Sequence, residues 1–336
     1  MSEEIDMAVV ERAREGREKV LKELRKVIVG QEDLIDQVLI ALFAGGHCLL
    51  IGVPGLAKTL LVSTLAKTLD MKFKRIQFTP DMMPSDITGT EILEEDVTTG
   101  HKKFTFVQGP VFTNLLLADE INRTPPKTQA ALLEAMQEKQ VSVGKETYKL
   151  EEPFMVMATQ NPLEQEGTYP LPEAQMDRFM FNLWVDYPSA SELKEIIKIT
   201  TAGGLAEPEA VLSGAEVLEF RKAVRMVPIS DHVIDYIVRL TMTTHPDNPD
   251  NPDICTKYLS WGAGPRCGQY LSLGAKARAL LRGNMQATVE DVQAVSNAVM
   301  RHRIFTNFSA QAEGITSDKI IEDLLKLVPE EDTAKA

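Results

Sequence analysis

The stretch that decides the fold is Cys48-Leu49-Leu50-Ile51-Gly52-Val53-Pro54-Gly55-Leu56-Ala57-Lys58-Thr59-Leu60. A short apolar run of strand length leads into a glycine-containing loop, and a helical pattern follows to about Leu69. Helical patterns separate several further apolar runs of strand length. These runs are residues 73–78, 115–119, 154–159 and 179–185. This alternation predicts the α/β class, with a parallel sheet flanked by helices.

Two stretches interrupt the alternation of strands and helices. Residues 91–107 have the pattern of a β-hairpin with Thr98-Thr99-Gly100 at its turn. Residues 140–150 predict a second hairpin that turns near Gly144-Lys145. We expect both hairpins to project from the sheet as insertions.

Both ends of the chain are predicted to be helical. Charge-rich residues 3–27 carry apolar side chains at helical spacing, and residues 31–44 repeat that pattern before a pair of glycines. No strand pattern follows Pro188. The helical patterns beyond it are residues 191–200, 215–227, 231–243, 265–282, 289–305 and 318–327. The predicted units are an N-terminal amphipathic helix, an α/β domain and an all-α domain, at residues 1–27, 28–188 and 189–336.

Composition and charge exclude several classes of protein. The 336-residue chain has a formal net charge of -13, so its surface repels nucleic-acid backbones and we expect no nucleic-acid partner. Cys48, Cys255 and Cys267 have neither disulfide-scaffold nor zinc spacing, and the histidines lack metal-ligand spacing. There is no signal-peptide pattern and no apolar run long enough to span a bilayer, so we expect a cytoplasmic protein.

The loop at residues 52–59 resembles the phosphate-binding P-loop, G-x-x-x-x-G-K-[ST]. Its glycines let backbone N–H groups point at phosphate oxygens, and Lys58 adds a positive charge toward the β- and γ-phosphates. The Thr59 hydroxyl can ligate Mg²⁺. Ala57 stands where glycine is expected, and alanine disfavours a positive φ angle. The predicted nucleotide contacts are Gly52, Val53, Pro54, Gly55, Leu56, Ala57, Lys58, Thr59 and Leu60. An ordinary glycine turn is the alternative.

A second chemical element is the apolar strand at residues 115–120, which ends in Asp119 and Glu120. It resembles a Walker B motif. Carboxyl ends of strands lie beside the phosphate loop in open α/β sheets. In that position Asp119 would hold Mg²⁺ through water, and Glu120 would polarise the attacking water. The alternative is a strand that happens to end in acidic residues.

A third element is Ala158-Thr159-Gln160-Asn161-Pro162, at the end of another apolar strand. It resembles sensor 1, in which the Asn161 amide would hydrogen-bond the γ-phosphate or the attacking water. An Asn-Pro turn after a strand is the alternative reading, and such turns are common.

Longer segments of the chain resemble the MoxR family of AAA+ ATPases. They are Val29-Gly30-Gln31, residues 78–89, residues 109–129 and the segment Tyr169-Pro170-Leu171-Pro172-Glu173-Ala174-Gln175-Met176-Asp177-Arg178-Phe179. MoxR proteins also have alanine before the P-loop lysine. The resemblance covers residues 29–305, which is most of the chain.

This resemblance implies a fold, an activity and an assembly. The fold would be the AAA+ module, a parallel five-stranded sheet domain with a helical lid and two β-hairpin inserts. The activity would be Mg²⁺-dependent ATP hydrolysis. Family members form homo-oligomeric rings, usually hexamers, with the ATP site between subunits. They are thought to remodel protein clients as chaperones do, often with partners that carry von Willebrand factor A domains.

The resemblance also implies roles for individual residues. Val29 and Gly30 would line the adenine pocket. Arg178 resembles the arginine finger that reaches a neighbour's γ-phosphate, with Arg123 as the rival candidate. Arg266 resembles sensor 2, which couples the phosphate state to lid position. Local pairing of a surface arginine is the alternative for Arg178 and for Arg266, and the lid sequence around Arg266 departs from the family pattern.

Three other functions share some of these motifs. A nucleotide-dependent switch would bind ATP with negligible turnover, although the presence of Glu120 favours hydrolysis. A metal-chelatase motor subunit has the same inserts, but residues 125–129 and 171–175 favour the MoxR family. A DNA-acting motor is opposed by the acidic charge and by the lack of a basic, aromatic-interleaved stretch.

Overall fold

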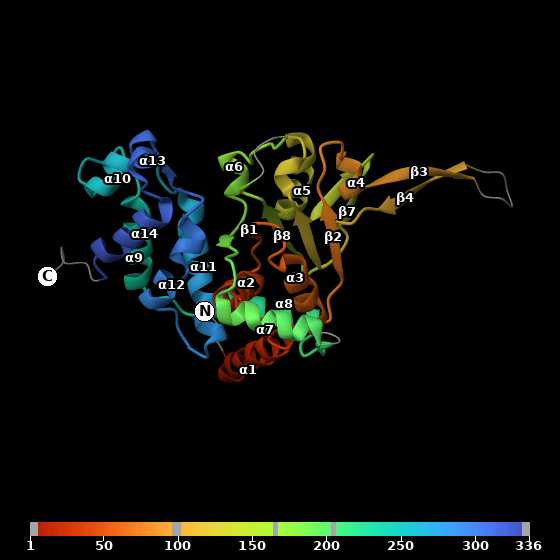
Figure 1. Ribbon diagram of the computed structural model, residues 1–336, viewed down its shortest axis with the longest axis horizontal. Helices are drawn as coiled ribbons and strands as arrows, with labels where there is room; N and C mark the ends of the chain where they lie inside the picture. Colours follow the sequence, from red (N-terminus) through yellow and green to blue (C-terminus); the bar gives the residue numbers. More distant parts are fainter. Residues whose placement is uncertain (1–5, 96–101, 164–166, 203–205, 331–336) are drawn as a thin grey trace.

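The computed structural model describes residues 6–95, 102–163, 167–202 and 206–330. Its centre is a five-stranded parallel sheet in the order β2-β5-β8-β1-β9 (Figure 1). The strands are β1 (Cys48–Ile51), β2 (Phe73–Gln77), β5 (Leu115–Asp119), β8 (Met155–Gln160) and β9 (Phe181–Trp184). The predicted α/β class and the predicted strands are confirmed.

Two apolar clusters cover the two faces of the sheet, and the strands alternate between them. In β5, Leu115 and Leu117 belong to one cluster, whereas Leu116 and Ala118 belong to the other. The helices of the first face are α1 (Met7–Leu24), α2 (Glu32–Ala44) and α3 (Lys58–Thr68), and those of the second are α4 (Pro84–Thr88) and α5 (Pro126–Glu138). Burial on both faces explains why the strand sequences are continuous apolar runs.

Both predicted hairpins are confirmed as antiparallel ribbons. One consists of β3 (Gly89–Glu95) and β4 (Lys102–Gln108), and it projects far from the body of the molecule (Figure 1). The predicted turn residues Thr98-Thr99-Gly100 lie outside the described residues. The other consists of β6 (Gln140–Val143) and β7 (Glu146–Lys149), with Gly144 at a positive φ angle of 61° in its turn.

The C-terminal half is mostly helical, as predicted. Its helices are α6 (Glu173–Met176), α7 (Ala190–Thr201), α8 (Gly214–Met226), α9 (Asp231–Met242), α10 (Asp253–Tyr258), α11 (Pro265–Leu281), α12 (Val289–Met300), α13 (Phe308–Glu313) and α14 (Ser317–Leu327). The prediction of an exclusively α-helical lid is wrong in one detail, because β10 (Leu259–Trp261) pairs with β11 (Phe305–Thr306). Strands this short carry no readable period, and their pairing joins distant parts of the sequence.

The sheet domain and the helices after it share one core. The first apolar cluster continues from α1–α3 into residues of α8, α9, α11 and α12. The division of the chain at residue 188 therefore stays a prediction. Within the described ranges, no helix has both the length and the apolar character needed to cross a membrane.

His47 joins strand β1 to its neighbours from a buried position. Its Nδ1 accepts a hydrogen bond from the Val156 N–H at 2.9 Å, and its Nε2 lies 3.2 Å from the Met136 carbonyl oxygen. Because the amide can only donate, the neutral ring with hydrogen on Nε2 satisfies both contacts. Burial lowers the pKa of His47 to about 4.

This buried histidine makes the fold sensitive to acid. The folded-state pKa lies below the ordinary value of 6.5, so the stabilising contribution is complete above pH 6.5 and is lost as the pH falls toward 4. We expect a loss of about 3 kcal/mol in the free energy of unfolding, at about 1.4 kcal/mol per pKa unit. Urea titrations across this range should show a smaller loss for His47→Gln. The exposed His232→Gln variant is the control, and equal losses in all three proteins would contradict the prediction.

Candidate active site

The P-loop lies between β1 and α3 with two residues in the left-handed region. Gly55 has a φ angle of 86° and Ala57 has one of 57°, and α3 begins at Lys58. The chain therefore accepts alanine at a positive φ, the conformation that sequence reasoning treated as unfavourable for it. A Cβ at Gly52 would lie 2.8 Å from the Val185 carbonyl oxygen, so only glycine fits that position without a shift.

Side chains from four segments meet in one cavity of about 400 Å³ at the carboxyl ends of the central strands. It is lined by Pro54, Gly55, Ala57, Lys58, Thr59, Leu60, Arg75, Gln77, Asp119, Glu120 and Asn161. Three motifs that are far apart in the sequence thus converge on one space. Carboxyl ends of parallel strands are where open α/β sheets bind ligands.

Lys58 faces the two carboxylates of this cavity. Its Nζ donates a 2.5 Å hydrogen bond to the Gly52 carbonyl oxygen. Burial lowers the pKa of Lys58, and the negative charges of Asp119 and Glu120 partly oppose that shift. A cation held here by main chain and acids is positioned to meet an anionic ligand.

Thr159 ties the two acidic residues to strand β8. Its hydroxyl donates to Asp119 Oδ1 at 2.6 Å and accepts from the Glu120 backbone N–H at 2.8 Å. Glu120 itself has a positive φ angle of 58°, which turns its side chain out of the strand direction. Thr159 belongs to the predicted sensor-1 motif, in which the sequence assigns a role only to Asn161.

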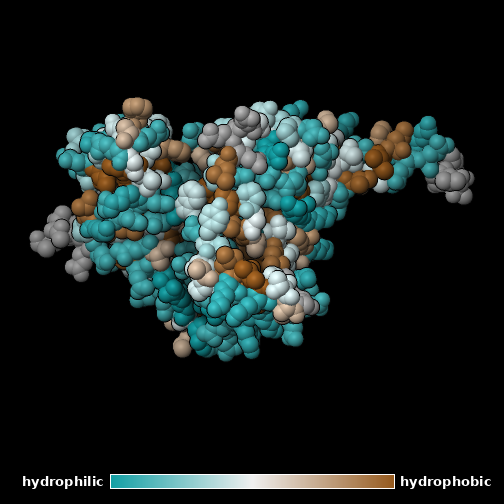
Figure 2. Space-filling model, viewed as in Figure 1, coloured by the Kyte–Doolittle hydropathy of each residue, from teal (hydrophilic) through white to brown (hydrophobic). Residues whose placement is uncertain are grey.

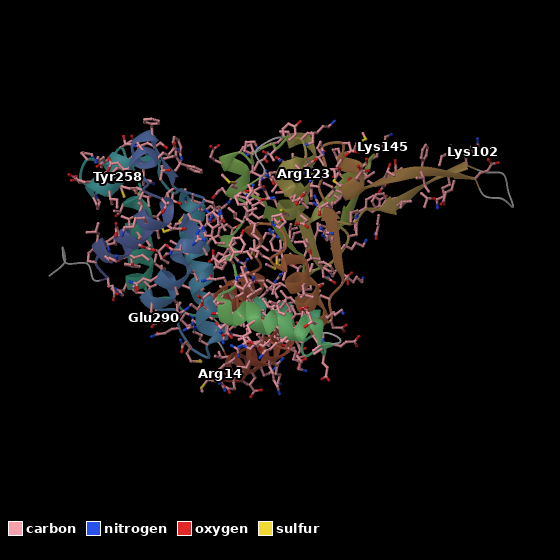
Figure 3. The ribbon with its side chains drawn as sticks, in the orientation of Figure 1. Arg14, Lys102, Arg123, Lys145, Tyr258 and Glu290 are labelled. Carbon is pink, nitrogen blue, oxygen red and sulfur yellow. The ribbon has the colours of Figure 1, made fainter. Side chains whose placement is uncertain are left out.

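The carboxylates are also held by Arg75 and Gln77, for which the sequence predicts no role, and by Arg123, the rival candidate for the arginine finger. Asp119 Oδ2 accepts from Arg75 Nε at 3.1 Å and from the Arg75 NH2 group at 2.6 Å. Glu120 Oε2 accepts from Gln77 Nε2 at 2.6 Å and from Arg123 at 3.1 Å. Figure 3 shows Arg123 beside α5. The sequence does not single out Arg75 and Gln77, because Lys74 in the same short run is polar as well.

Two alternatives were open for Asn161, a sensor-1 amide at the site and a turn after the strand, and its position is compatible with both. It is buried and lines the cavity, while its Oδ1 accepts from the Leu163 N–H at 3.1 Å and closes a turn. That bond leaves the side-chain amide nitrogen as the group able to donate into the cavity.

A second cavity of about 130 Å³ adjoins the P-loop and is mainly apolar. It is lined by Val27, Ile28, Val29, Gln31, Gly55, Leu56, Ala57, Leu60, Pro188, Ile196, Ile199 and Thr200. Gly30 lies beside it with a φ angle of 71°, and a Cβ there would fall 2.0 Å from Glu192 Oε1 on α7. An apolar slot next to a phosphate loop suits the flat face of a base.

The two remaining arginines lie elsewhere. Neither Arg178 nor Arg266 lines these two cavities. Arg266 donates to Asp177 Oδ2 at 2.7 Å and lines a separate cavity of about 810 Å³ between α6 and the lid. Among the described residues Arg178 forms no ion pair, and its carbonyl oxygen lies 3.4 Å from the Tyr270 hydroxyl.

Comparison with known proteins places this geometry in a family. Residues 47–181 match the profile of the ATPase family associated with various cellular activities (AAA), and residues 252–324 match the AAA lid domain. Chaperone MoxR1 of Mycobacterium tuberculosis is 42% identical over 313 residues, covering 93% of this chain and 81% of the relative. This chain belongs to the MoxR family of AAA ATPases.

Other relatives agree with membership of the MoxR family. Protein MoxR of Methylorubrum extorquens is 28% identical, with 94% of each chain covered. A crystal structure of a candidate ATPase from Cytophaga hutchinsonii superposes with a TM-score of 0.89 at 43% identity, covering 96% of this chain and 97% of that one. The α/β fold with an AAA lid, predicted from sequence, is confirmed.

The residues of this MoxR protein fit ATP with Mg²⁺. The cavity offers a hydroxyl from Thr59 and a carboxylate from Asp119, and hard oxygen ligands of this kind suit Mg²⁺. In the part of the chain that the structure describes, no cluster of three or more His, Cys, Asp or Glu side chains could hold a metal. Mg²⁺ bound with a nucleotide needs few protein ligands, because phosphate and water supply the others.

The bridging role of Thr159 can be tested by removing its hydroxyl. Thr159→Val keeps the shape of this buried side chain but leaves Asp119 Oδ1 and the Glu120 N–H without their shared partner. We expect a loss of about 1–3 kcal/mol in the free energy of unfolding, measured by urea denaturation. Thr159→Ser retains the hydroxyl and is the control. A valine variant as stable as the wild type would refute the bridge.

Proposed function

We propose that this chain is an ATP-hydrolysing remodeller that acts on protein clients. The observation that carries the proposal is the convergence of the P-loop, Asp119, Glu120 and Asn161 on one cavity. A phosphate cradle, a metal-binding carboxylate, a general base and an amide donor are the parts that hydrolysis of a phosphoanhydride requires.

In this proposal the P-loop amides and Lys58 hold the β- and γ-phosphates. Thr59 and Asp119 are the residues that would hold Mg²⁺. Bound there, Mg²⁺ would neutralise charge on the phosphate oxygens. Glu120 orients the attacking water and accepts its proton, and the Asn161 amide donates to the water or to the γ-phosphate. The apolar slot beside Val29 and Leu60 takes the adenine ring.

We infer that hydrolysis is shared across a subunit interface in a homo-oligomeric ring, with a hexamer as the expected size. Arg178 is the preferred arginine finger because it forms no ion pair among the described residues. Arg123 is the weaker candidate, since it already pairs with Glu120 of its own chain. Arg266 is the proposed sensor 2, and its bond to Asp177 means that it reaches phosphate only after the lid moves or across an interface.

The client and the partner are inferred from kinship. One relative is named a chaperone, which supports remodelling of proteins. A partner with a von Willebrand factor A domain and a cytoplasmic location are proposed on the family resemblance alone. The surface offers one feature suited to protein contact, because Leu93 and Phe104 are exposed on the β3–β4 ribbon, where Figure 2 shows apolar side chains. The 42% sequence identity to Chaperone MoxR1 disfavours the alternative of a metal-chelatase motor subunit.

The first test is the ATPase rate as a function of protein concentration, with the oligomer size measured in parallel. We expect the specific rate to rise with assembly. Glu120→Gln and Arg178→Ala should each lower it at least about a hundredfold while ATP still binds.

Mixing two inactive variants tests whether Arg178 acts on its neighbour. Lys58→Ala subunits lose ATP binding but keep Arg178, whereas Arg178→Ala subunits keep an intact ATP site. A mixture should regain activity if Arg178 works across the interface. The matched control is Lys58→Ala mixed with Glu120→Gln, in which no site is complete. Rescue by Arg123→Ala or Arg266→Ala mixtures, without rescue by Arg178→Ala, would reassign the finger.

A nucleotide-dependent switch is the second candidate function, and the bonding of Glu120 favours it. Gln77 and Arg123 both hydrogen-bond Glu120 Oε2, one of the two carboxylate oxygens that could accept from the attacking water. A base held in this way turns over slowly until something releases it.

Gln77→Ala separates these two candidates. If Gln77 restrains Glu120, its removal should raise the basal ATPase rate about fivefold, the equivalent of one ordinary hydrogen bond. Gln108→Ala, at an exposed position on β4, is the control. A fall in the rate would mean that Gln77 holds Glu120 in a productive orientation, which supports the remodeller over the switch.

A further inference from the structure

Arg75 occupies the carboxylate that the proposed metal site needs. Both of its contacts fall on Asp119 Oδ2, at 3.1 Å from Nε and 2.6 Å from the NH2 group. Asp119 Oδ1 is already engaged by the Thr159 hydroxyl at 2.6 Å. Both oxygens of this carboxylate therefore accept hydrogen bonds, and Oδ2 accepts two of them from a cation.

The strand register fixes this arrangement. β2 lies beside β5 with Gln77 opposite Asp119 and Arg75 opposite Leu117. The long Arg75 side chain therefore reaches diagonally to a residue two positions further along the neighbouring strand. Arg75 and Gln77 lie on the same face, because side chains two residues apart point the same way. Both line the phosphate cavity.

We propose that Arg75 is a metal-responsive positioning residue, which neutralises Asp119 in the free protein and must leave it when Mg²⁺ enters with a nucleotide. A water that joined Mg²⁺ to Asp119 would need an acceptor site on this carboxylate, and Arg75 already makes two contacts with Oδ2. The guanidinium and a divalent cation beside the same carboxylate would also repel each other. The inference rests on the proposed ATPase function, since it concerns the same metal site.

The departure of Arg75 would also reach the catalytic base. Arg75 hydrogen-bonds Gln77 Oε1 and so fixes the orientation of the Gln77 amide, whose nitrogen donates to Glu120 Oε2 at 2.6 Å. When Arg75 leaves, the amide loses the bond that orients it, and its hold on Glu120 weakens. Loss of the Arg75–Asp119 pair would thereby be transmitted to Glu120 through the side chains of Arg75 and Gln77.

The test measures nucleotide binding, so no turnover is involved. A fluorescent ADP analogue is titrated against Arg75→Met in excess Mg²⁺ and in excess EDTA. The dissociation constant in EDTA divided by that in Mg²⁺ is the benefit of Mg²⁺, the factor by which the metal strengthens binding. We expect that benefit to be about fivefold larger than in the wild type, because no cation has to be displaced. Affinity in EDTA should be unchanged or weaker, since a positive charge near the phosphates has been removed.

Matched variants identify the cause. Lys74→Met removes an adjacent exposed charge from the same strand and should leave the ratio unchanged. In an Asp119→Asn background, Arg75→Met should also have no effect on the ratio. Arg75→Lys keeps the charge without the planar fork and should give a smaller rise. If the methionine variant fails to fold, as judged by circular dichroism, the lysine variant decides.

The opposing outcomes are distinct. An unchanged ratio for Arg75→Met would make the pair a structural ion pair and overturn the inference. Equal loss of affinity with and without Mg²⁺ would make Arg75 a phosphate ligand and overturn it as well. A chain that binds ADP but never hydrolyses ATP would refute the proposed function while leaving this ratio measurable, so the two failures can be told apart.

Discussion

The parallel sheet is stable only when apolar side chains cover both of its faces, and the alternating side chains of β5 meet that requirement. In the central strand β5 the interior is therefore apolar, and its first acidic side chain, Asp119, stands at the end of the strand. Because the strands are parallel, their carboxyl ends lie at one edge. The P-loop, Asp119 and Asn161 share a cavity for this reason, although long stretches of sequence separate them.

Around that cavity, both carboxylates lie beside positively charged side chains. Two carboxylates, Asp119 and Glu120, are surrounded by Lys58, Arg75 and Arg123, and each carboxylate is paired with one of the arginines. A triphosphate with its metal brings both signs of charge into this arrangement. In the proposed function these pairs would be exchanged for new ones, which would couple nucleotide binding to activation through one electrostatic rearrangement.

The lid is connected to the sheet domain through Asp177 as well as through the shared core. Asp177 accepts from Arg266 at 2.7 Å and from Arg303 at 2.8 Å, and both arginines belong to the lid. Arg178, the proposed finger, is the next residue. A change in the lid that alters these ion pairs would therefore shift the main chain that carries Arg178. Arg266, the proposed sensor 2, and Arg178, the proposed arginine finger, are thus connected through Asp177.

Local patterns in the sequence predict the α/β class, both hairpins and the order of the P-loop, the acidic strand end at residues 119–120 and Asn161, because periodicity, turn chemistry and short motifs are local properties. The sequence also pointed to Ala57 as unusual, and that residue does take a positive φ angle. Only the tertiary structure decided that Arg75 and Gln77 belong to the site and that β10 pairs with β11. Those facts depend on which strands become neighbours. Strand neighbours are chosen by the packing of the whole core, and no local pattern along the chain records that choice.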